Sequence, residues 1–199
     1  MWQFFVDGGI MMLPLTLCSV LALGIVIERI LFYSFNVMPN DREVEIFKTH
    51  LRQGQITQAK AMAASWGGAM GAIADYGLKQ WEEDLEAADA AFQSAGDVQL
   101  KRMQRGLGML DTIVTAAPLL GLLGTVTGII KAFSAIGVVG GNQSAQLSAG
   151  IAEALYNTAF GLGIAIPAMF LVNFFYGIVE KRAGRITCYC QEILAVIKR

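Results

Sequence analysis

Residues 150–167 read GIAEALYNTAFGLGIAIP and place one carboxylate, Glu153, at the start of a long apolar run. From Ala154 to Val179 there are 26 consecutive residues without a charge, and about 20 apolar residues suffice for a helix to cross the bilayer core. An ionisable group within a membrane span costs roughly 2.5–3.5 kcal/mol on insertion scales, so it marks a candidate functional site. The stretch therefore predicts a membrane-spanning helix with a functional acid at one end.

The composition of the whole chain agrees with a membrane protein. Of its 199 residues, 55% are hydrophobic and 16% are charged, and the mean hydropathy is +0.52. Soluble domains have about 25% charged residues. The formal net charge of −1 argues against nucleic acid as a partner.

The first apolar run also has the length of a membrane span. Residues 8–27 are 20 uncharged residues that end at Glu28 and Arg29, and a helix of that length covers about 30 Å. A cleaved signal peptide is the alternative, but its apolar core is roughly 7–15 residues long and follows basic residues, whereas this run follows Asp7. We therefore expect a retained span, with Tyr33 as an aromatic anchor at its far end.

The positions of the basic residues predict the orientation. The polar loop at residues 137–146, between the second and third apolar runs, contains no Lys or Arg. Basic clusters lie at the other ends of the same two runs; they are Lys101, Arg102 and Arg105, and Lys181, Arg182 and Arg185. Because cytoplasmic segments carry the excess of basic residues, we expect the N-terminus and the loop outside and the C-terminus in the cytoplasm.

The segment between the first and second spans has the pattern of a helical domain. Asn40, followed by Glu43 three residues later, predicts a capping pair at a helix start, and apolar residues then recur at helical spacing until Gly54. Residues 85–107 are typical of an alanine-rich helix, and the acidic cluster at residues 82–86 complements its N-terminus. We interpret that cluster as a solvated helix start, and contact with a basic partner is the alternative.

The predicted fold class is an all-α membrane protein with three transmembrane helices, a helical cytoplasmic domain between the first and second, and long helices that extend into the cytoplasm. The expected segments are a periplasmic N-terminus (1–9), transmembrane helix 1 (10–33), the cytoplasmic domain (34–108), transmembrane helix 2 (109–136), a periplasmic loop (137–146), transmembrane helix 3 (147–179) and a cytoplasmic C-terminal helix (180–199).

The second and third spans share a face of small residues that contains one threonine. The spacing i, i+4, i+7, i+11 is filled by Gly121, Thr125, Gly128 and Ala132 in one span and by Ala154, Thr158, Gly161 and Ala165 in the other. The two threonines have the same predicted depth, and Asn157 and Glu153 lie at the edge of the second face. Such faces suit either close helix packing or the lining of a narrow polar pore. Because a small face in lipid needs another helix against it, we expect a homo-oligomer.

Lys131 is the charged residue within the second apolar run. Its predicted depth is close to that of Glu153, so the two side chains can form an ion pair. Alternatively, Lys131 can snorkel to the outer interface. We favour snorkelling, which predicts that neutralising the two charges has additive effects.

The chain has no motif of catalysis or cofactor binding. No P-loop, dinucleotide fingerprint or Ser/His/Asp grouping occurs, and Cys188 and Cys190 are too few ligands for a closed zinc site. The sequence therefore predicts no enzyme, no metal and no cofactor.

Two stretches carry a family resemblance. Residues 117–133, APLLGLLGTVTGIIKAF, and residues 150–168, GIAEALYNTAFGLGIAIPA, resemble the paired signature of the MotA/TolQ/ExbB proton-channel family. Three spans in a short chain are similar to its ExbB/TolQ branch. Tyr156 and Asn157 depart from the pattern, because many relatives have small or apolar residues there.

The resemblance implies a multi-pass subunit of the bacterial inner membrane that forms a homopentamer around the helices of a dimeric, single-span ExbD- or TolR-like partner. Proton flow would then energise an outer-membrane transport or envelope process through a TonB- or TolA-like protein. In the family, the partner's aspartate takes the proton, and the channel subunit lines the pathway at positions that match Thr125, Thr158 and Glu153. The alternatives are a flagellar-stator-like motor subunit and a stand-alone ion or solute transporter.

The predicted orientation can be tested by cysteine labelling after the native cysteines are replaced by alanine. Gly140→Cys should react with a membrane-impermeant maleimide in intact cells, whereas Gln80→Cys should react only after permeabilisation. The reason is that segments flanked by basic residues stay on the cytoplasmic side of the membrane. The reverse labelling pattern would contradict the orientation.

Overall fold

The computed structural model describes residues 8–83, 85–136 and 143–197. The predicted outer loop around Gly140 lies outside the described residues, as do the side chains of the acidic cluster at residues 82–86. The described elements are, in order, the short 3-10 helix η1 (Gly9–Met11) and the α-helices α2 (Met12–Phe35), α3 (Asp41–Arg52), α4 (Ile56–Trp66), α5 (Gly68–Glu83), α6 (Leu85–Gln104), α7 (Leu107–Ile136) and α8 (Gln143–Ile197).

Three helical stretches of the described chain are long and apolar enough to cross a membrane. They are Gly9–Phe35, whose most apolar window has a mean hydropathy of 2.5, and Ala88–Ser134 and Ser144–Ile197, each with 2.0. The prediction of an all-α protein with three spans is therefore confirmed.

The chain divides into two compact units. Unit 1 comprises Met1–Ile27 and Gly106–Phe174, and unit 2 comprises Glu28–Arg105 and Phe175–Arg199. Helices α2 and α8 contribute residues to both units. All the site residues predicted from the sequence belong to unit 1.

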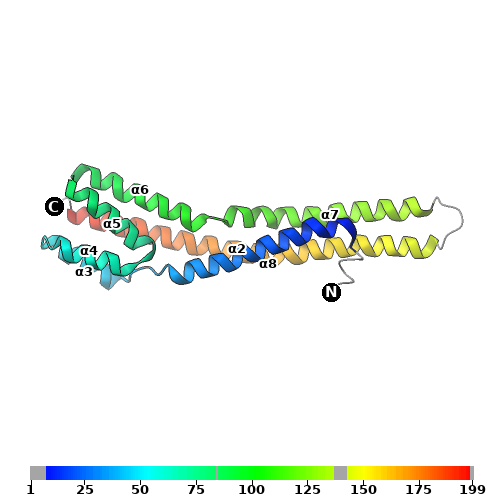
Figure 1. The fold of residues 1–199 in the computed structure, drawn as a ribbon, viewed down its shortest axis with the longest axis horizontal. Coiled ribbons are helices and arrows are strands. Elements are labelled where there is room, and N and C mark those ends of the chain that lie inside the picture. The colour runs from blue at the N-terminus through cyan, green and yellow to red at the C-terminus, as the bar shows by residue number, and fades with distance from the viewer. Residues whose placement is uncertain (1–7, 84, 137–142, 198–199) are drawn as a thin grey trace. The chain divides into compact units, whose positions relative to one another are not determined.

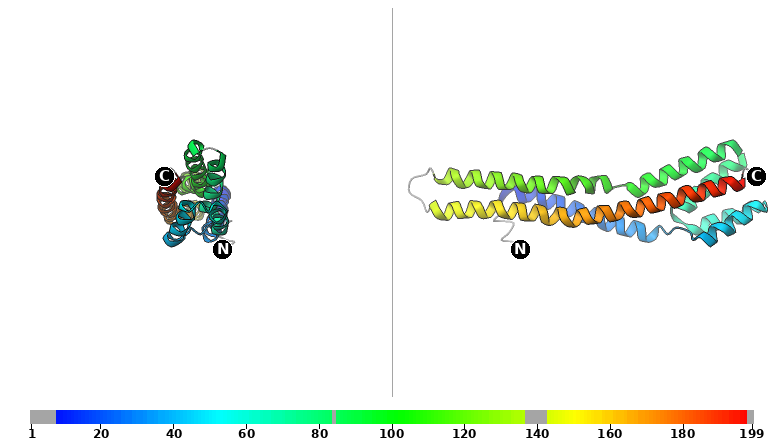
Figure 2. Two further views of the ribbon diagram at one scale, coloured as in Figure 1. Left: turned by 90° about the vertical axis from the view of Figure 1, so that its left-hand side faces the viewer. Right: turned by 180° about the vertical axis from the view of Figure 1, so that it is seen from behind.

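In unit 1, helices α7 and α8 lie side by side and antiparallel, and they pack through small residues (Figures 1 and 2). A Cβ added to Gly121 would lie 2.9 Å from the carbonyl oxygen of Asn157, and one added to Gly161 would lie 2.6 Å from the carbonyl oxygen of Ala117. Since real Cβ atoms do not approach oxygen that closely, only glycine fits at either position. The two helix backbones are thus in direct contact.

The small-residue faces therefore pack against each other within one chain. Ala132 and Ala154 are buried in this contact, and Ala154 lies against Gly128. The two faces thus largely cover each other, and only the threonines Thr125 and Thr158 remain partly exposed; the expected homo-oligomer stays a prediction. Many of the exposed side chains of the pair are large and apolar, among them Leu119, Leu122, Ile130, Phe133, Leu155 and Phe170.

Helix α2 packs along the same pair in unit 1. It begins part-way along α7 and α8, which both continue past its start (Figures 1 and 2). Its first turns are anchored by the buried side chains of Met12 and Leu15. An apolar groove of ≈ 610 Å³ separates α2 from α8, with Leu23 on one wall and Phe160 on the other.

Unit 2 contains a helical domain in which α3 packs on α4, α4 on α5 and α5 on α6. The predicted capping box of α3 is confirmed: the Asn40 side chain accepts a hydrogen bond from the Glu43 backbone N–H, and the Glu43 carboxylate accepts one from the Asn40 N–H, both at 2.8 Å. Phe47 is buried against Trp66, with ring centroids 4.9 Å apart.

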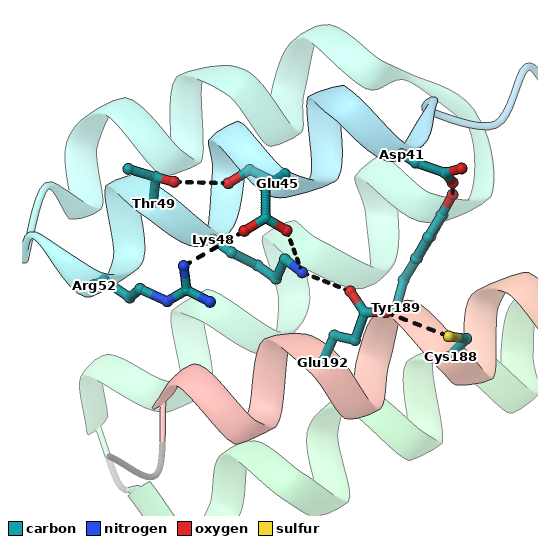
Figure 3. A network of polar contacts seen from close by, with 8 residues as sticks. All are labelled: Asp41, Glu45, Lys48, Thr49, Arg52, Cys188, Tyr189 and Glu192. Atoms are coloured by element: carbon teal, nitrogen blue, oxygen red, sulfur yellow. Dashed lines mark hydrogen bonds and ion pairs between the residues drawn. The ribbon is translucent and has the colours of Figure 1, made fainter.

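A polar network joins α3 to the C-terminal part of α8 within unit 2 (Figure 3). The Lys48 ammonium lies 2.7 Å from the Glu192 carboxylate and 2.6 Å from that of Glu45, and Tyr189 donates a hydrogen bond to Asp41. The hydrogen bonds to Glu192 and then Glu45 raise the pKa of Lys48. A lysine with a raised pKa stabilises the fold below its unfolded pKa of about 10.4, and this contribution is lost as the pH rises through the folded pKa. Lys48 is therefore charged at neutral pH.

A buried arginine joins α2 to the end of α6 in unit 2. Arg29 is only 2% exposed, and its guanidinium binds the Glu28 carboxylate through two contacts of 2.5 Å. It also donates to the carbonyl oxygens of Arg102 and Met103, each at 3.1 Å. Carbonyls in the last turn of a helix lack intrahelical partners, and a cation there also interacts favourably with the helix dipole. Arg29 thus caps the C-terminus of α6.

Tyr33 belongs to the same buried contact. Its hydroxyl donates to the Met103 carbonyl oxygen at 2.7 Å, and its ring packs on Phe175 with centroids 5.7 Å apart. The Arg182 guanidinium lies 5.2 Å from the ring centroid. The prediction of a lipid-facing aromatic anchor is wrong, because a tyrosine at the end of an apolar run has the same sequence pattern whether it faces lipid or a neighbouring helix.

Removing the Arg29 side-chain charge tests the cap. We expect Arg29→Met to lower the free energy of unfolding by about 2 kcal/mol, since it deprives two carbonyls and one carboxylate of a charged donor. Thermal unfolding of the purified protein in detergent measures this loss. Arg42→Met, at an exposed position of α3, is the control and should change stability by no more than about 0.5 kcal/mol. Equal losses in the two variants would contradict the cap.

Candidate functional site

The predicted acid of the third span, Glu153, forms an ion pair with Lys131. The distance from Lys131 Nζ to Glu153 Oε1 is 2.7 Å, and the side chains are 57% and 19% exposed, respectively. The structure thus contains the ion pair and not the snorkelling lysine that we favoured. The reason is the register of α7 on α8, which brings the two side chains to one level, where a half-buried carboxylate gains a counter-charge.

The ion pair borders a hollow of ≈ 450 Å³. Gln146, Gly150 and Tyr156 of α8 line it together with the pair. Among the described residues, no three His, Cys, Asp or Glu side chains are grouped as a metal site requires. The hollow is thus bordered by one carboxylate and one ammonium group.

The two predicted threonines lie further along the same helix pair. Thr158 Oγ1 donates across the contact to the Gly121 carbonyl oxygen at 3.2 Å, whereas Thr125 Oγ1 donates within its own helix to Leu122 at 2.6 Å. Thr158 follows Glu153 by five residues, or about 7.5 Å of helix rise. Each hydroxyl has used its hydrogen, but its oxygen keeps lone pairs that can accept.

Asn157 is buried in the helix contact. Its side chain is 0% exposed, and its Nδ2 donates to the Glu153 carbonyl oxygen at 3.0 Å. The side chain lies against Gly124, where an added Cβ would collide with it. Its Oδ1 has no hydrogen-bond partner among the described residues. Asn157 is therefore a helix-packing residue within this chain.

The remaining candidate residues are also buried. They carry no side-chain donor or acceptor, so they bring the two helices together and leave the chemistry to their neighbours. These residues are Gly121, Gly128, Ala154, Gly161 and Ala165.

One neighbour of the acid was missed in the sequence. Gly9, in the η1 turn, lies directly against Glu153, because an added Cβ would collide with Glu153 Oε1 and would lie 3.5 Å from Lys131 Nζ. The only signal was the Gly8–Gly9 dipeptide, which indicates a turn but not the side chain against which the turn packs.

The two cysteines of the C-terminal part of α8 are not part of this site. Cys188 is exposed and Cys190 is buried. Burial raises the pKa of Cys190 to about 11, so its thiol stays protonated and unreactive at neutral pH.

Comparison with known proteins gives one consistent family. A sequence model described as the MotA/TolQ/ExbB proton channel family matches residues 44–187. The biopolymer transport protein ExbB-like 1 of Synechocystis is 36% identical over 168 residues, which cover 83% of this chain and 66% of that protein. ExbB-like 3 of the same organism is 30% identical over 196 residues, 90% of each chain. The Tol-Pal system protein TolQ of Pseudomonas aeruginosa is 34% identical over 115 residues, 58% of this chain and 50% of TolQ.

The fold and the site define a multi-pass membrane protein that holds an acid between two of its apolar helices. The matched residues include both small-residue helices and most of the helical domain. The chain belongs to the MotA/TolQ/ExbB proton channel family, in its ExbB/TolQ branch.

The ion pair changes our expectation for the charge-neutralising variants. Lys131→Met and Glu153→Gln each leave one charge without its partner, so the double variant should lose less than the sum of the single losses, with a coupling of about 1 kcal/mol. Thermal unfolding in detergent measures the coupling. Lys181→Met, which removes an exposed lysine elsewhere on α8, should be additive with Glu153→Gln. If the losses of stability in Lys131→Met and Glu153→Gln were also additive, the Lys131–Glu153 ion pair would contribute no stability.

Proposed function

We propose that this chain is the proton-channel subunit of a bacterial inner-membrane motor complex that uses the proton motive force to energise an outer-membrane transport or envelope process. The observation that carries the proposal is the Lys131–Glu153 pair, with two threonine hydroxyls further along the same helix contact. Membership of a proton channel family, and relatives named for biopolymer transport and for the Tol-Pal system, support the same function.

Glu153 is the group at which a proton enters the path. Its carboxylate adjoins a hollow in which Gln146 and Tyr156 offer further polar partners for water. The oxygens of Thr125 and Thr158 then accept hydrogen bonds from waters deeper in the path. Hydroxyls are suited to this role because they donate and accept without holding a fixed charge.

The next carboxylate in the path is supplied by another chain. The described parts of unit 1 carry acids at Glu153 on α8 and at Asp111 near the opposite end of α7, and no carboxylate lies in the spans between these levels. A partner helix with an aspartate fills this gap, as in an ExbD- or TolR-like single-span protein. The large apolar side chains outside α7 and α8 suit contact with lipid and with further copies of this subunit.

The complex is a homopentamer around a dimer of that partner, and it transmits work to a TonB- or TolA-like protein. The N-terminus lies in the periplasm, and the helical domain and the C-terminus lie in the cytoplasm, as the basic clusters indicate. This arrangement places the Glu153 end of the path on the outer side, where protons enter.

Valine substitutions test the hydroxyls, because valine is close to threonine in shape but lacks the hydroxyl. We expect Thr125→Val and Thr158→Val to leave assembly with the partner intact and to abolish proton-driven work. Glu153→Gln should weaken that work strongly, and Glu153→Asp should be milder because it keeps the charge. Energised uptake or envelope integrity is measured in cells that lack the native chain and express each variant, and copurification of the partner measures assembly.

Thr127→Val is the matched control for these variants. Thr127 lies two residues from Thr125 on α7, and its hydroxyl also donates to backbone carbonyls of its own helix, at Leu123 and Gly124. The Thr127→Val variant should retain proton-driven work at the wild-type level. If Thr125→Val and Thr158→Val both assemble and work at wild-type levels, the threonines are packing residues and the proposed path is wrong.

A further inference from the structure

The carboxylate of Glu153 is enclosed from two sides in unit 1. The Lys131 ammonium is 2.7 Å from Oε1, and the backbone of Gly9 in the η1 turn lies against the same oxygen. The η1 turn, which leads into α2 (Figure 1), therefore lies against the carboxylate, while the Lys131 ammonium stays partly exposed.

Two properties of Gly9 restrict this position to glycine. Its φ is +66°, in the left-handed region that side chains disfavour, and a Cβ on Gly9 would occupy the space of Glu153 Oε1 and Cδ. A positive φ is common in turns, whereas the overlap of an added Cβ with Glu153 is specific to this turn and links it to the acid.

The η1 turn is held in place by its own contacts. The Met12 backbone N–H donates to the carbonyl oxygens of Gly9 and Ile10. Met12 and Leu15 are buried at the start of α2, and η1 itself packs on α7. The turn is thus a fixed surface against which the carboxylate rests.

The backbone that carries Glu153 is also fixed. Its neighbour Ala154 is buried against Gly128, where an added Cβ would already lie 3.1 Å from the Ala154 Cβ. A methyl group introduced on Gly9 would therefore displace the end of the Glu153 side chain from the position in which it contacts Lys131.

We propose that Gly9 is a positioning residue, whose bare backbone holds the Glu153 carboxylate against Lys131 at the outer end of the proton path. This inference rests on the proposed function, since it assigns the η1 turn a part in the same proton path. It makes the start of the first span a component of the channel.

The first test measures the carboxylate itself. The full chain in its native membrane is treated with a water-soluble carbodiimide and an amine, and modification of Glu153 is quantified by mass spectrometry. Gly9→Ala should raise this modification about fivefold, the factor that corresponds to the loss of an ion pair of ordinary strength. Unchanged modification would overturn the inference, whatever the effect on work.

Two control variants separate the contact with Glu153 from the other effects of adding a methyl group to a glycine. Gly24→Ala adds a methyl group to α2 where nothing lies within 4 Å, and Gly54→Ala adds one at a φ of +69° with equally open surroundings. The first control reproduces the added methyl, and the second reproduces the backbone strain. Both should leave Glu153 modification at the wild-type level, and a rise in either would remove the assignment to the Gly9 contact.

The second test is a double-mutant cycle on proton-driven work in complemented cells. Aspartate is one methylene shorter, so its carboxylate is withdrawn from the Gly9 backbone. Gly9→Ala should lower work about fivefold with glutamate at position 153 and have little effect in the Glu153→Asp background. Equal losses in both backgrounds would overturn the positioning role.

The outcomes distinguish the inference from the function on which it rests. If Gly9→Ala raises Glu153 modification but leaves proton-driven work unchanged, while Glu153→Gln weakens that work strongly, the positioning role is wrong and the proposed function stands. If Glu153→Gln works at the wild-type level, the proposed function fails, and Gly9 has no role in proton flow even where modification rises.

Discussion

The direct contact between the α7 and α8 backbones is the constraint on which unit 1 depends. Gly121 and Gly161 leave no room for a Cβ, and Gly128 receives Ala154. In lipid the hydrophobic effect does not drive helices together, so close approach through small residues supplies the attraction. The register of that contact decides which polar groups meet, and it places Lys131 opposite Glu153.

The polar residues of the candidate site thus lie in a packing interface and not on a loop. Thr158 reaches a carbonyl of the opposite helix, and Asn157 bonds back to the carbonyl of Glu153. Both bonds satisfy polar groups that would be costly to leave unpaired among apolar side chains. The same glycines that permit packing therefore also permit the polar groups to lie inside it.

Unit 2 is stabilised by a different set of interactions. Arginine side chains cap the C-terminal ends of its helices. Arg29 donates to the last carbonyl oxygens of α6, and Arg182 donates to the carbonyl oxygens of Tyr33 and Asn36 at the end of α2. Lys48 bridges acids of α3 and α8. These contacts are directional and charge-assisted, and they satisfy groups at helix ends that lack intrahelical partners.

The sequence by itself determined the helices, their apolar character and the residues of the candidate site. Uncharged runs and small-residue spacing are local properties, and so is the capping box at Asn40 and Glu43. The sequence did not determine which faces meet, because spacing describes one helix at a time. Only the tertiary structure turned the small faces of α7 and α8 toward each other, paired Lys131 with Glu153, buried Tyr33 and brought Gly9 onto the acid. Each of these contacts joins residues far apart in the chain, and the register of packed helices is fixed by the whole interface.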